Sequence, residues 1–130
     1  PTSHTYFDYG QGKHPENPAF DTIGGNLSVE KVYSFEPIPP KFTEAQRKLV
    51  LGCQAQLWGE YIYNPAKQEY MAFPRACALA EVAWSENAGR SWAEFQPRLD
   101  AHLKRLDALK VNYRRPDGTP AVTEKVGRGE

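Results

Sequence analysis

The chain has 130 residues, with 16 Lys and Arg against 16 Asp and Glu, so its formal net charge is zero. A neutral chain lacks the basic surface that attracts nucleic acids and anionic membranes, which argues against both as main partners. No apolar run approaches the ~20 residues of a membrane span. The chain begins Pro-Thr-Ser-His, without Met or a signal-peptide pattern. We therefore expect a piece of a longer protein that forms at most one domain.

The first elements in chain order are a strand, a long loop and a short helix. Residues 1–9 are β-branched and aromatic, which predicts a strand ending at Gly10. Residues 10–40 are repeatedly interrupted by Gly and Pro and predict an irregular connection. Within it, residues 29–35 fit either a helical turn or a short strand. Thr43 and Gln46 match a capping box, which predicts a short helix to about Leu49.

The second half predicts a strand and two helices. Residues 50–58 read as a buried strand, and residues 69–84 as a helix with Pro74 in its first turn. The last helix starts at Ser91 as N-cap, and Pro97 in its early part is compatible with a second start. Its apolar residues recur at spacings of three and four: Trp92, Phe95, Leu99, Leu103, Leu106 and Leu109. The order of strands and helices indicates α/β architecture with parallel strands, although two strands are too few for an independent sheet.

Cysteine and histidine residues give no sign of a metal or redox site. Cys53 and Cys77 belong to no Cys-x-x-Cys or Cys/His cluster, and we expect both to be buried free thiols. His4 and His14 fit loop or structural roles better than catalysis, and His102 falls within the last helix. We expect no metal and no organic cofactor.

Two short segments each place a carboxylate beside aromatic residues at the end of a predicted strand: Tyr6-Phe7-Asp8-Tyr9 and Trp58-Gly59-Glu60-Tyr61. Residues i and i+2 of a strand share a face, so Tyr6 and Asp8 are expected to point together, as are Trp58 and Glu60. An aromatic ring with a carboxylate suits a sugar, whose hydroxyls donate hydrogen bonds. Taken singly, each of these residues fits packing or capping better than sugar binding, and only the repetition of the pattern keeps the sugar-binding interpretation open.

A pair of carboxylates also suggests an ordinary retaining glycosidase, in which the two carboxyl groups lie about 5 Å apart. The candidates are Asp8 and Glu60. Nothing in the sequence fixes their separation or raises the pKa of either group, so we do not favour this reading.

Five stretches together resemble glycoside hydrolase family 20, the β-N-acetylhexosaminidases. They are SHTYFDYGQG at residues 3–12, VEKVYSFEPIP at 29–39, LGCQAQLWGEYI at 51–62, EYMAFPRACALAEVAWS at 69–85 and RSWAEFQPRLDAHLKRLDALKVNYRRP at 90–116. The resemblance implies a C-terminal fragment of a (β/α)8 barrel, running from the end of strand seven to helix eight with a closing helix. Residues 1–116 would be this part of the catalytic barrel, and residues 117–130 a loose C-terminal tail.

The resemblance also implies roles for the site residues. Tyr6 would donate a hydrogen bond to the carbonyl oxygen of the substrate's 2-acetamido group. Asp8 and Glu60 would bind hydroxyls of the non-reducing sugar, O6 and O4 respectively, and Trp58 would form a wall of the pocket. The implied reaction is retaining hydrolysis in which the acetamido oxygen attacks the anomeric carbon, an exception to the two-carboxylate scheme.

One departure from the family is large. The catalytic acid of the family is a Glu preceded by an Asp, and no adjacent Asp-Glu occurs in these 130 residues. We therefore expect the chain alone to be inactive, with a non-catalytic sugar-binding or interaction fragment as the alternative function. Trp84, Trp92, Phe95 and the leucine stripe of the last helix would be left unburied, which would require self-association or the missing N-terminal part of the barrel. The expected partner is a glycan ending in N-acetylhexosamine. The resemblance favours a periplasmic or secreted location, although the sequence itself does not identify the compartment.

Overall fold

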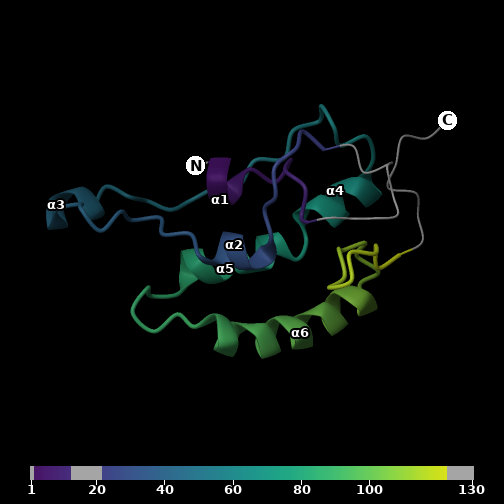
Figure 1. Ribbon diagram of the computed structural model, residues 1–130. Helices are drawn as coiled ribbons and strands as arrows, with labels where there is room; N and C mark the ends of the chain where they lie inside the picture. Colours follow the sequence, from purple (N-terminus) through teal and green to yellow (C-terminus); the bar gives the residue numbers. More distant parts are fainter. Residues whose placement is uncertain (1, 13–21, 123–130) are drawn as a thin grey trace.

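The computed structural model describes residues 2–12 and 22–122, and its helices form stacked layers (Figure 1). α2 lies beside α5, α6 runs along one side of this pair, and α1 lies on the other side. α3 projects away from the body of the molecule. The helices within the described residues are α1 (Thr2–Thr5), α2 (Val29–Tyr33), α3 (Glu44–Arg47), α4 (Pro65–Ala72), α5 (Arg75–Trp84) and α6 (Trp92–Ala108). In this part of the chain, no helix is long and apolar enough to cross a membrane.

The two predicted strands are reduced to a single parallel bridge between Tyr6 and Gln56. The Phe7 amide donates to the Gln56 carbonyl at 2.9 Å, and the Gln56 amide donates to the Thr5 carbonyl at 3.0 Å. The prediction of a strand over residues 1–9 was wrong in its first half, where α1 forms instead. A strand forms only where another segment pairs with it, and here the segment at residues 50–58 pairs with this one at a single position, Gln56.

The short helices of the first half begin at polar caps. The ambiguous segment at residues 29–35 forms α2, because the Ser28 side chain accepts from the Lys31 amide. The predicted capping box is confirmed: Thr43 Oγ1 accepts from the Gln46 amide, and Gln46 Oε1 accepts from the Thr43 amide. The helix that follows, α3, ends at Arg47, and none of its residues is buried.

The single helix predicted over residues 69–84 is in fact two, α4 and α5, which meet at a cis Phe73–Pro74 bond. Phe73 is extended, with φ −104° and ψ 141°, and Pro74 is the N-cap of α5 rather than a residue of its first turn. The break has a local cause, because a residue before proline is driven out of the helical region. α4 starts earlier than predicted, at Pro65, behind the Asn64 cap.

α6 confirms the prediction for the last helix, with Ser91 as N-cap, and it continues through Pro97 without a second start. Its buried residues are Phe95, Leu99, Leu103 and Leu106. Beyond the helix, Lys110 adopts a positive φ of 58°, and the Val111 amide donates to the Leu106 carbonyl at 2.9 Å. This bond, with that from the Lys110 amide to the Asp107 carbonyl, forms a Schellman end.

A single apolar cluster joins α2, α5 and α6 and includes Phe7, Val32, Tyr33, Ala78, Val82 and the buried side chains of α6. The expectation that Trp84, Trp92, Phe95 and the leucine stripe need an outside partner is wrong for Phe95 and most of the leucines, which this cluster buries, whereas Trp84 stays exposed. Phe95 stacks on Tyr33 with ring centroids 4.8 Å apart, and Trp92 contacts both rings. The large apolar side chains that remain exposed include Leu49, Leu51, Trp84 and Leu109.

Residues 112–122 form an ordered return of the chain against α4. The Ala121 amide donates to the Tyr113 carbonyl, and the Val122 amide donates to Asn112 Oδ1. The turn at Pro116-Asp117-Gly118 is held by Tyr70, whose hydroxyl donates to the Gly118 carbonyl at 2.7 Å. Hydrogen bonds thus hold the first residues of the predicted tail, and residues 123–130 lie outside the described residues.

Candidate functional site

The parallel bridge brings the two aromatic and acidic segments of the sequence together. Residue 6 pairs with residue 56, so the chain directions place residues 7–9 beside residues 57–60. The contact is direct, because the Trp58 amide donates to Asp8 Oδ1 at 3.0 Å and to Oδ2 at 3.3 Å. The two segments that follow this bridge therefore form one continuous edge that carries Tyr6, Asp8, Trp58 and Glu60.

Strand alternation was predicted to make Tyr6 and Asp8 point together, but the segment does not continue as a strand. The Tyr9 amide donates to the Tyr6 carbonyl at 3.1 Å, which closes a turn over residues 6–9. The turn buries Asp8, which is 1% exposed, whereas Tyr6 remains half-buried. The alternation rule failed here because it assumes that the extended path continues past Phe7.

The Asp8 carboxyl lies in an environment of opposing influences. Burial raises its pKa, while the Trp58 amide and the Arg75 guanidinium counteract the rise and the Glu60 carboxylate adds to it. The Tyr6 ring packs edge-on against Tyr9, with ring centroids 5.1 Å apart. Desolvation and the carboxylates of Asp8 and Glu60 raise the pKa of Tyr6, so its hydroxyl stays protonated at neutral pH and can donate a hydrogen bond.

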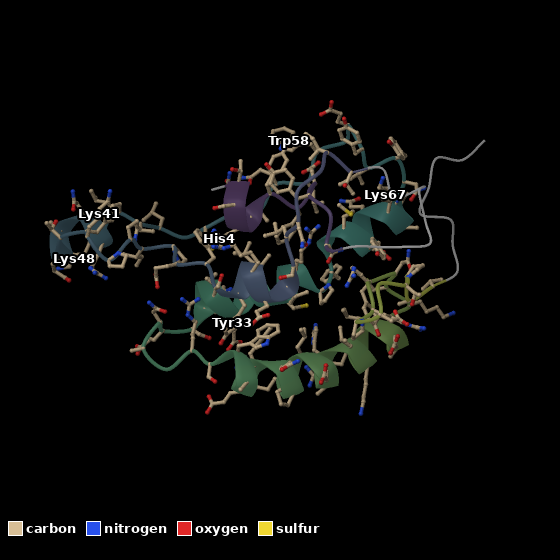
Figure 2. The ribbon with its side chains drawn as sticks, in the orientation of Figure 1. His4, Tyr33, Lys41, Lys48, Trp58 and Lys67 are labelled. Carbon is tan, nitrogen blue, oxygen red and sulfur yellow. The ribbon has the colours of Figure 1, made fainter. Side chains whose placement is uncertain are left out.

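Trp58 and Glu60 lie on the exposed side of the same edge. Trp58 is 58% exposed, and Figure 2 shows its side chain on the opposite side of the molecule from α6. Glu60 is exposed as well. The site is an open wall rather than a closed pocket, with an accessible indole and carboxylate beside a buried, hydrogen-bonded carboxyl group.

Sequence reasoning missed Arg75, the first residue of α5, as part of this site. It is 0% exposed, and its guanidinium donates to the carbonyls of Phe7 at 2.6 Å and Tyr9 at 2.8 Å. Burial lowers its pKa to about 9, with Arg114 acting in the same direction and Asp8 opposing it. At neutral pH the group is charged. The available signal was a cation at the start of a mainly apolar helix.

The remaining candidates lie away from this edge or outside the described residues. The His4 ring stacks on Phe35, with centroids 5.6 Å apart, and burial lowers its pKa. Cys53 and Cys77 are free, as predicted, but only half-buried, and burial raises the pKa of Cys77 to about 11. His14 is outside the described residues.

A separate groove of about 540 Å³ lies between α5 and α6. Its lining is mainly apolar and includes Phe73, Ala76, Ala80, Trp84 and Leu99, with Glu81, Arg98, His102 and Arg105 among its polar residues. None of the four predicted site residues contributes to it. The exposed indole of Trp84 therefore belongs to a different surface from that of Trp58.

Adjacent ends of parallel strands, backed by helices, are typical of one portion of an α/β barrel, whose active site lies at the strand ends. The catalytic-domain model of glycosyl hydrolase family 20 matches residues 1–87. The chain belongs to this family. Its structural neighbours are barrel enzymes of the family, and its fold is consistent with part of such a barrel.

Similar proteins are β-hexosaminidases. The Porphyromonas gingivalis β-hexosaminidase is 39% identical over 111 residues, which cover 85% of this chain and 14% of that protein. The human β-hexosaminidase subunit beta is 33% identical over 86 residues, covering 66% of this chain and 15% of that protein. The chain thus spans about a seventh of the length of these relatives.

Solved structures of the family superpose on most of the chain. The exo-β-N-acetylglucosaminidase of Vibrio harveyi, in complex with N-acetylglucosamine, gives a TM-score of 0.77 at 40% identity and covers 89% of this chain and 18% of that one. The β-N-acetylhexosaminidase of Streptomyces coelicolor gives 0.73 at 29% identity, with 89% and 23% coverage. These likenesses extend the match beyond residue 87 to most of the chain.

Proposed function

We propose that this chain forms a sugar-binding wall in the active site of a β-N-acetylhexosaminidase, an enzyme that removes terminal non-reducing N-acetylhexosamine residues. The observation that carries the proposal is the hydrogen bond from the Trp58 amide to Asp8, which joins the two aromatic and acidic segments into one edge. Family membership supplies the substrate class. In barrel terms, the chain runs from the end of strand seven to helix eight and a closing helix, residues 1–116, followed by a short tail.

Each side chain of the edge has a role that its environment supports. Tyr6 donates to the carbonyl oxygen of the 2-acetamido group, for which its raised pKa keeps the proton in place. Trp58 packs its exposed indole against the sugar and its acetamido group. Glu60, the exposed carboxylate, accepts from O4, and Asp8 accepts from O6 through acceptor capacity that the single Trp58 amide leaves over.

The reaction is retaining hydrolysis with the substrate's own acetamido oxygen as nucleophile. Holding that oxygen in line with the anomeric carbon converts attack into an intramolecular step, which is the contribution we assign to Tyr6. Its hydroxyl also stabilises the group as charge develops. Protonation of the leaving oxygen requires a Glu paired with an Asp, and no adjacent Asp-Glu is present in these 130 residues. The chain alone binds sugar but does not turn it over.

The binding role is tested by titrating the 130-residue chain with N-acetylglucosamine and following backbone amide shifts by NMR. We expect weak binding, on the order of millimolar, with shifts at residues 6–9 and 57–60. Trp58→Ala should weaken binding at least tenfold, whereas Trp84→Ala, which removes an exposed indole from another surface, should not. Absence of wild-type binding, or equal losses in the two variants, would refute the proposal.

The catalytic part of the proposal has its own measurement. Incubation of the chain with a chromogenic N-acetylglucosaminide should release no chromophore above the rate in buffer. Turnover by the purified chain would contradict the assignment of the acid to residues outside it. Binding without turnover also fits the alternative of a non-catalytic sugar-binding unit, and the two are separated by adding the remaining barrel segments of a family member and looking for activity.

We further propose that the exposed apolar residues contact the other strands and helices of the barrel, from the same polypeptide or from another one. Leu51 is 99% exposed and Trp84 is 91% exposed, while the neighbouring apolar residues of α6 are buried within the chain. Light scattering should find the chain self-associated when it is alone. A compact, monodisperse monomer in light scattering would contradict this proposal.

A further inference from the structure

Arg75 occupies an unusual position for a charged residue. Its side chain is fully buried, and its guanidinium donates to four main-chain carbonyls: Phe7, Tyr9, Leu27 and Met71. The guanidinium also lies over the Phe7 ring, 4.7 Å from its centroid. Burying a cation is costly unless its donors are satisfied, and an arginine fork can satisfy several carbonyls at once.

The carbonyls that Arg75 binds are not scattered through the fold. Phe7 and Tyr9 precede and follow Asp8, so two of these hydrogen bonds hold the main chain on both sides of the site carboxylate. The Leu27 carbonyl, a third acceptor, belongs to a residue whose amide donates to the Gly10 carbonyl at 2.7 Å. Arg75 therefore holds the turn at residues 6–9 through its carbonyls and connects it to the chain at residue 27.

Asp8 connects the turn to the second segment of the edge, residues 57–60. Its carboxylate accepts from the Trp58 amide, so the place of the Trp58 main chain depends on where the turn holds Asp8. The sequence of contacts is continuous from α5 to the exposed edge. It runs from Arg75 to the carbonyls beside Asp8, from Asp8 to the Trp58 amide, and from there to the indole.

We propose that Arg75 is a positioning residue of the sugar site: by binding the carbonyls of Phe7 and Tyr9 it holds Asp8 against the Trp58 amide and so sets the spacing of Tyr6 and Trp58. This inference rests on the proposed function for its consequence in sugar binding, although the positioning itself is testable without sugar. Arg75 touches no substrate and acts through Asp8. The positive charge of the guanidinium also attracts the Asp8 carboxylate, and this attraction favours the ionised form that accepts from the Trp58 amide.

The matched control is Arg90. Its side chain is 9% exposed, and its guanidinium donates to the Phe35 carbonyl at 3.2 Å and pairs with Glu36, outside the site. Arg75→Lys and Arg90→Lys each keep the charge and lose the planar fork. If Arg75 had a purely structural role, the two substitutions would both lower stability, and neither would change the hydrogen bond between the Trp58 amide and Asp8.

The experiment follows the Trp58 amide by NMR in the 130-residue chain as the pH is lowered. In the wild type its proton resonance should titrate with Asp8, as expected for a donor to a carboxylate. Arg75→Lys should shift the resonance upfield and remove this titration, while Arg90→Lys should leave both unchanged. With N-acetylglucosamine, Arg75→Lys should raise Kd at least tenfold and Arg90→Lys less than twofold. A folded Arg75→Lys chain with wild-type Trp58 titration overturns the proposal.

A measurement on the wild type covers the case in which Arg75→Lys does not fold. Scalar couplings across hydrogen bonds, from the Arg75 guanidinium nitrogens to the carbonyl carbons of Phe7 and Tyr9, should be detectable, and the guanidinium protons should exchange slowly. Rapid exchange without such couplings overturns the proposal. If the wild type binds no N-acetylglucosamine while the Trp58 signature depends on Arg75, the proposed function fails and the positioning role stands.

Discussion

The strand-end edge and the α6 layer are held together by different forces. At the edge, a buried cation and a buried carboxyl group bind main-chain atoms, as in the contacts of Arg75 with Phe7 and of Asp8 with Trp58. In the α6 layer, Phe95 and the leucines pack into one apolar cluster. The difference separates two tasks, since apolar burial contributes free energy without direction, whereas hydrogen bonds fix orientation and add little net stability.

Phe95→Ala is the substitution expected to have the largest effect on stability. Its ring is 4% exposed and stacks on Tyr33, and truncating such a core residue costs about 3–5 kcal/mol. Urea denaturation followed by circular dichroism measures the loss. Leu109→Ala, at the 72% exposed end of the same helix, should change the free energy of unfolding by less than about 0.5 kcal/mol. Similar losses in both variants would mean that α6 does not supply the core.

Glu81→Gln probes the polar contact of the helical layer and should have a smaller effect. Glu81 accepts two hydrogen bonds from Arg98, which lower its pKa below the ordinary 4.5. Because Arg98 is 58% exposed, water screens the pair, and its contribution to the free energy of unfolding is small. The contribution is present at neutral pH and is lost as the pH falls below 4.5 and through the lower folded-state pKa. Denaturation of both chains across this range should show the difference shrinking to zero.

Asp8→Asn should cause no measurable loss of stability at pH 7 and should show the opposite pH dependence. Burial raises the pKa of Asp8 above 3.8, so ionisation costs the folded state at neutral pH. As the pH falls through the raised pKa toward 3.8, this cost disappears, and the wild type gains stability relative to Asp8→Asn. A difference that changes in the same direction as for Glu81→Gln would contradict the assignment of Asp8 as a group placed for binding.

Local sequence signals account for much of the helical layer. The apolar spacing of α6 and the Thr43 capping box depend on residues three or four positions apart, and both predictions were confirmed. The strand at residues 1–9 was mispredicted, because pairing is non-local and, among the described residues of this segment, only Tyr6 forms a bridge, with Gln56. The break before Arg75 was also missed, although proline at position 74 provided the local reason.

For the candidate site, the sequence marks two separate segments but does not describe how they lie relative to each other. The bridge between Tyr6 and Gln56 and the bond from the Trp58 amide to Asp8 bring these segments to one edge. The burial of Asp8 follows from the turn closed by the Tyr9 amide, which side-chain patterns do not encode. The role of Arg75 is hidden for a similar reason, because its acceptors are carbonyls that every residue carries.

The preference of this edge for main-chain partners has a consequence for how the site can change. The bond to Asp8 comes from the amide of residue 58, and Arg75 binds carbonyls at residues 7, 9 and 27. Any amino acid except proline can supply the amide at position 58, so its indole can be exchanged without loss of that bond. A ring of another size or polarity would then be presented from the same anchor point. For the proposed sugar-binding role, this means that the side chain at position 58 can be redesigned while the framework of the edge is retained.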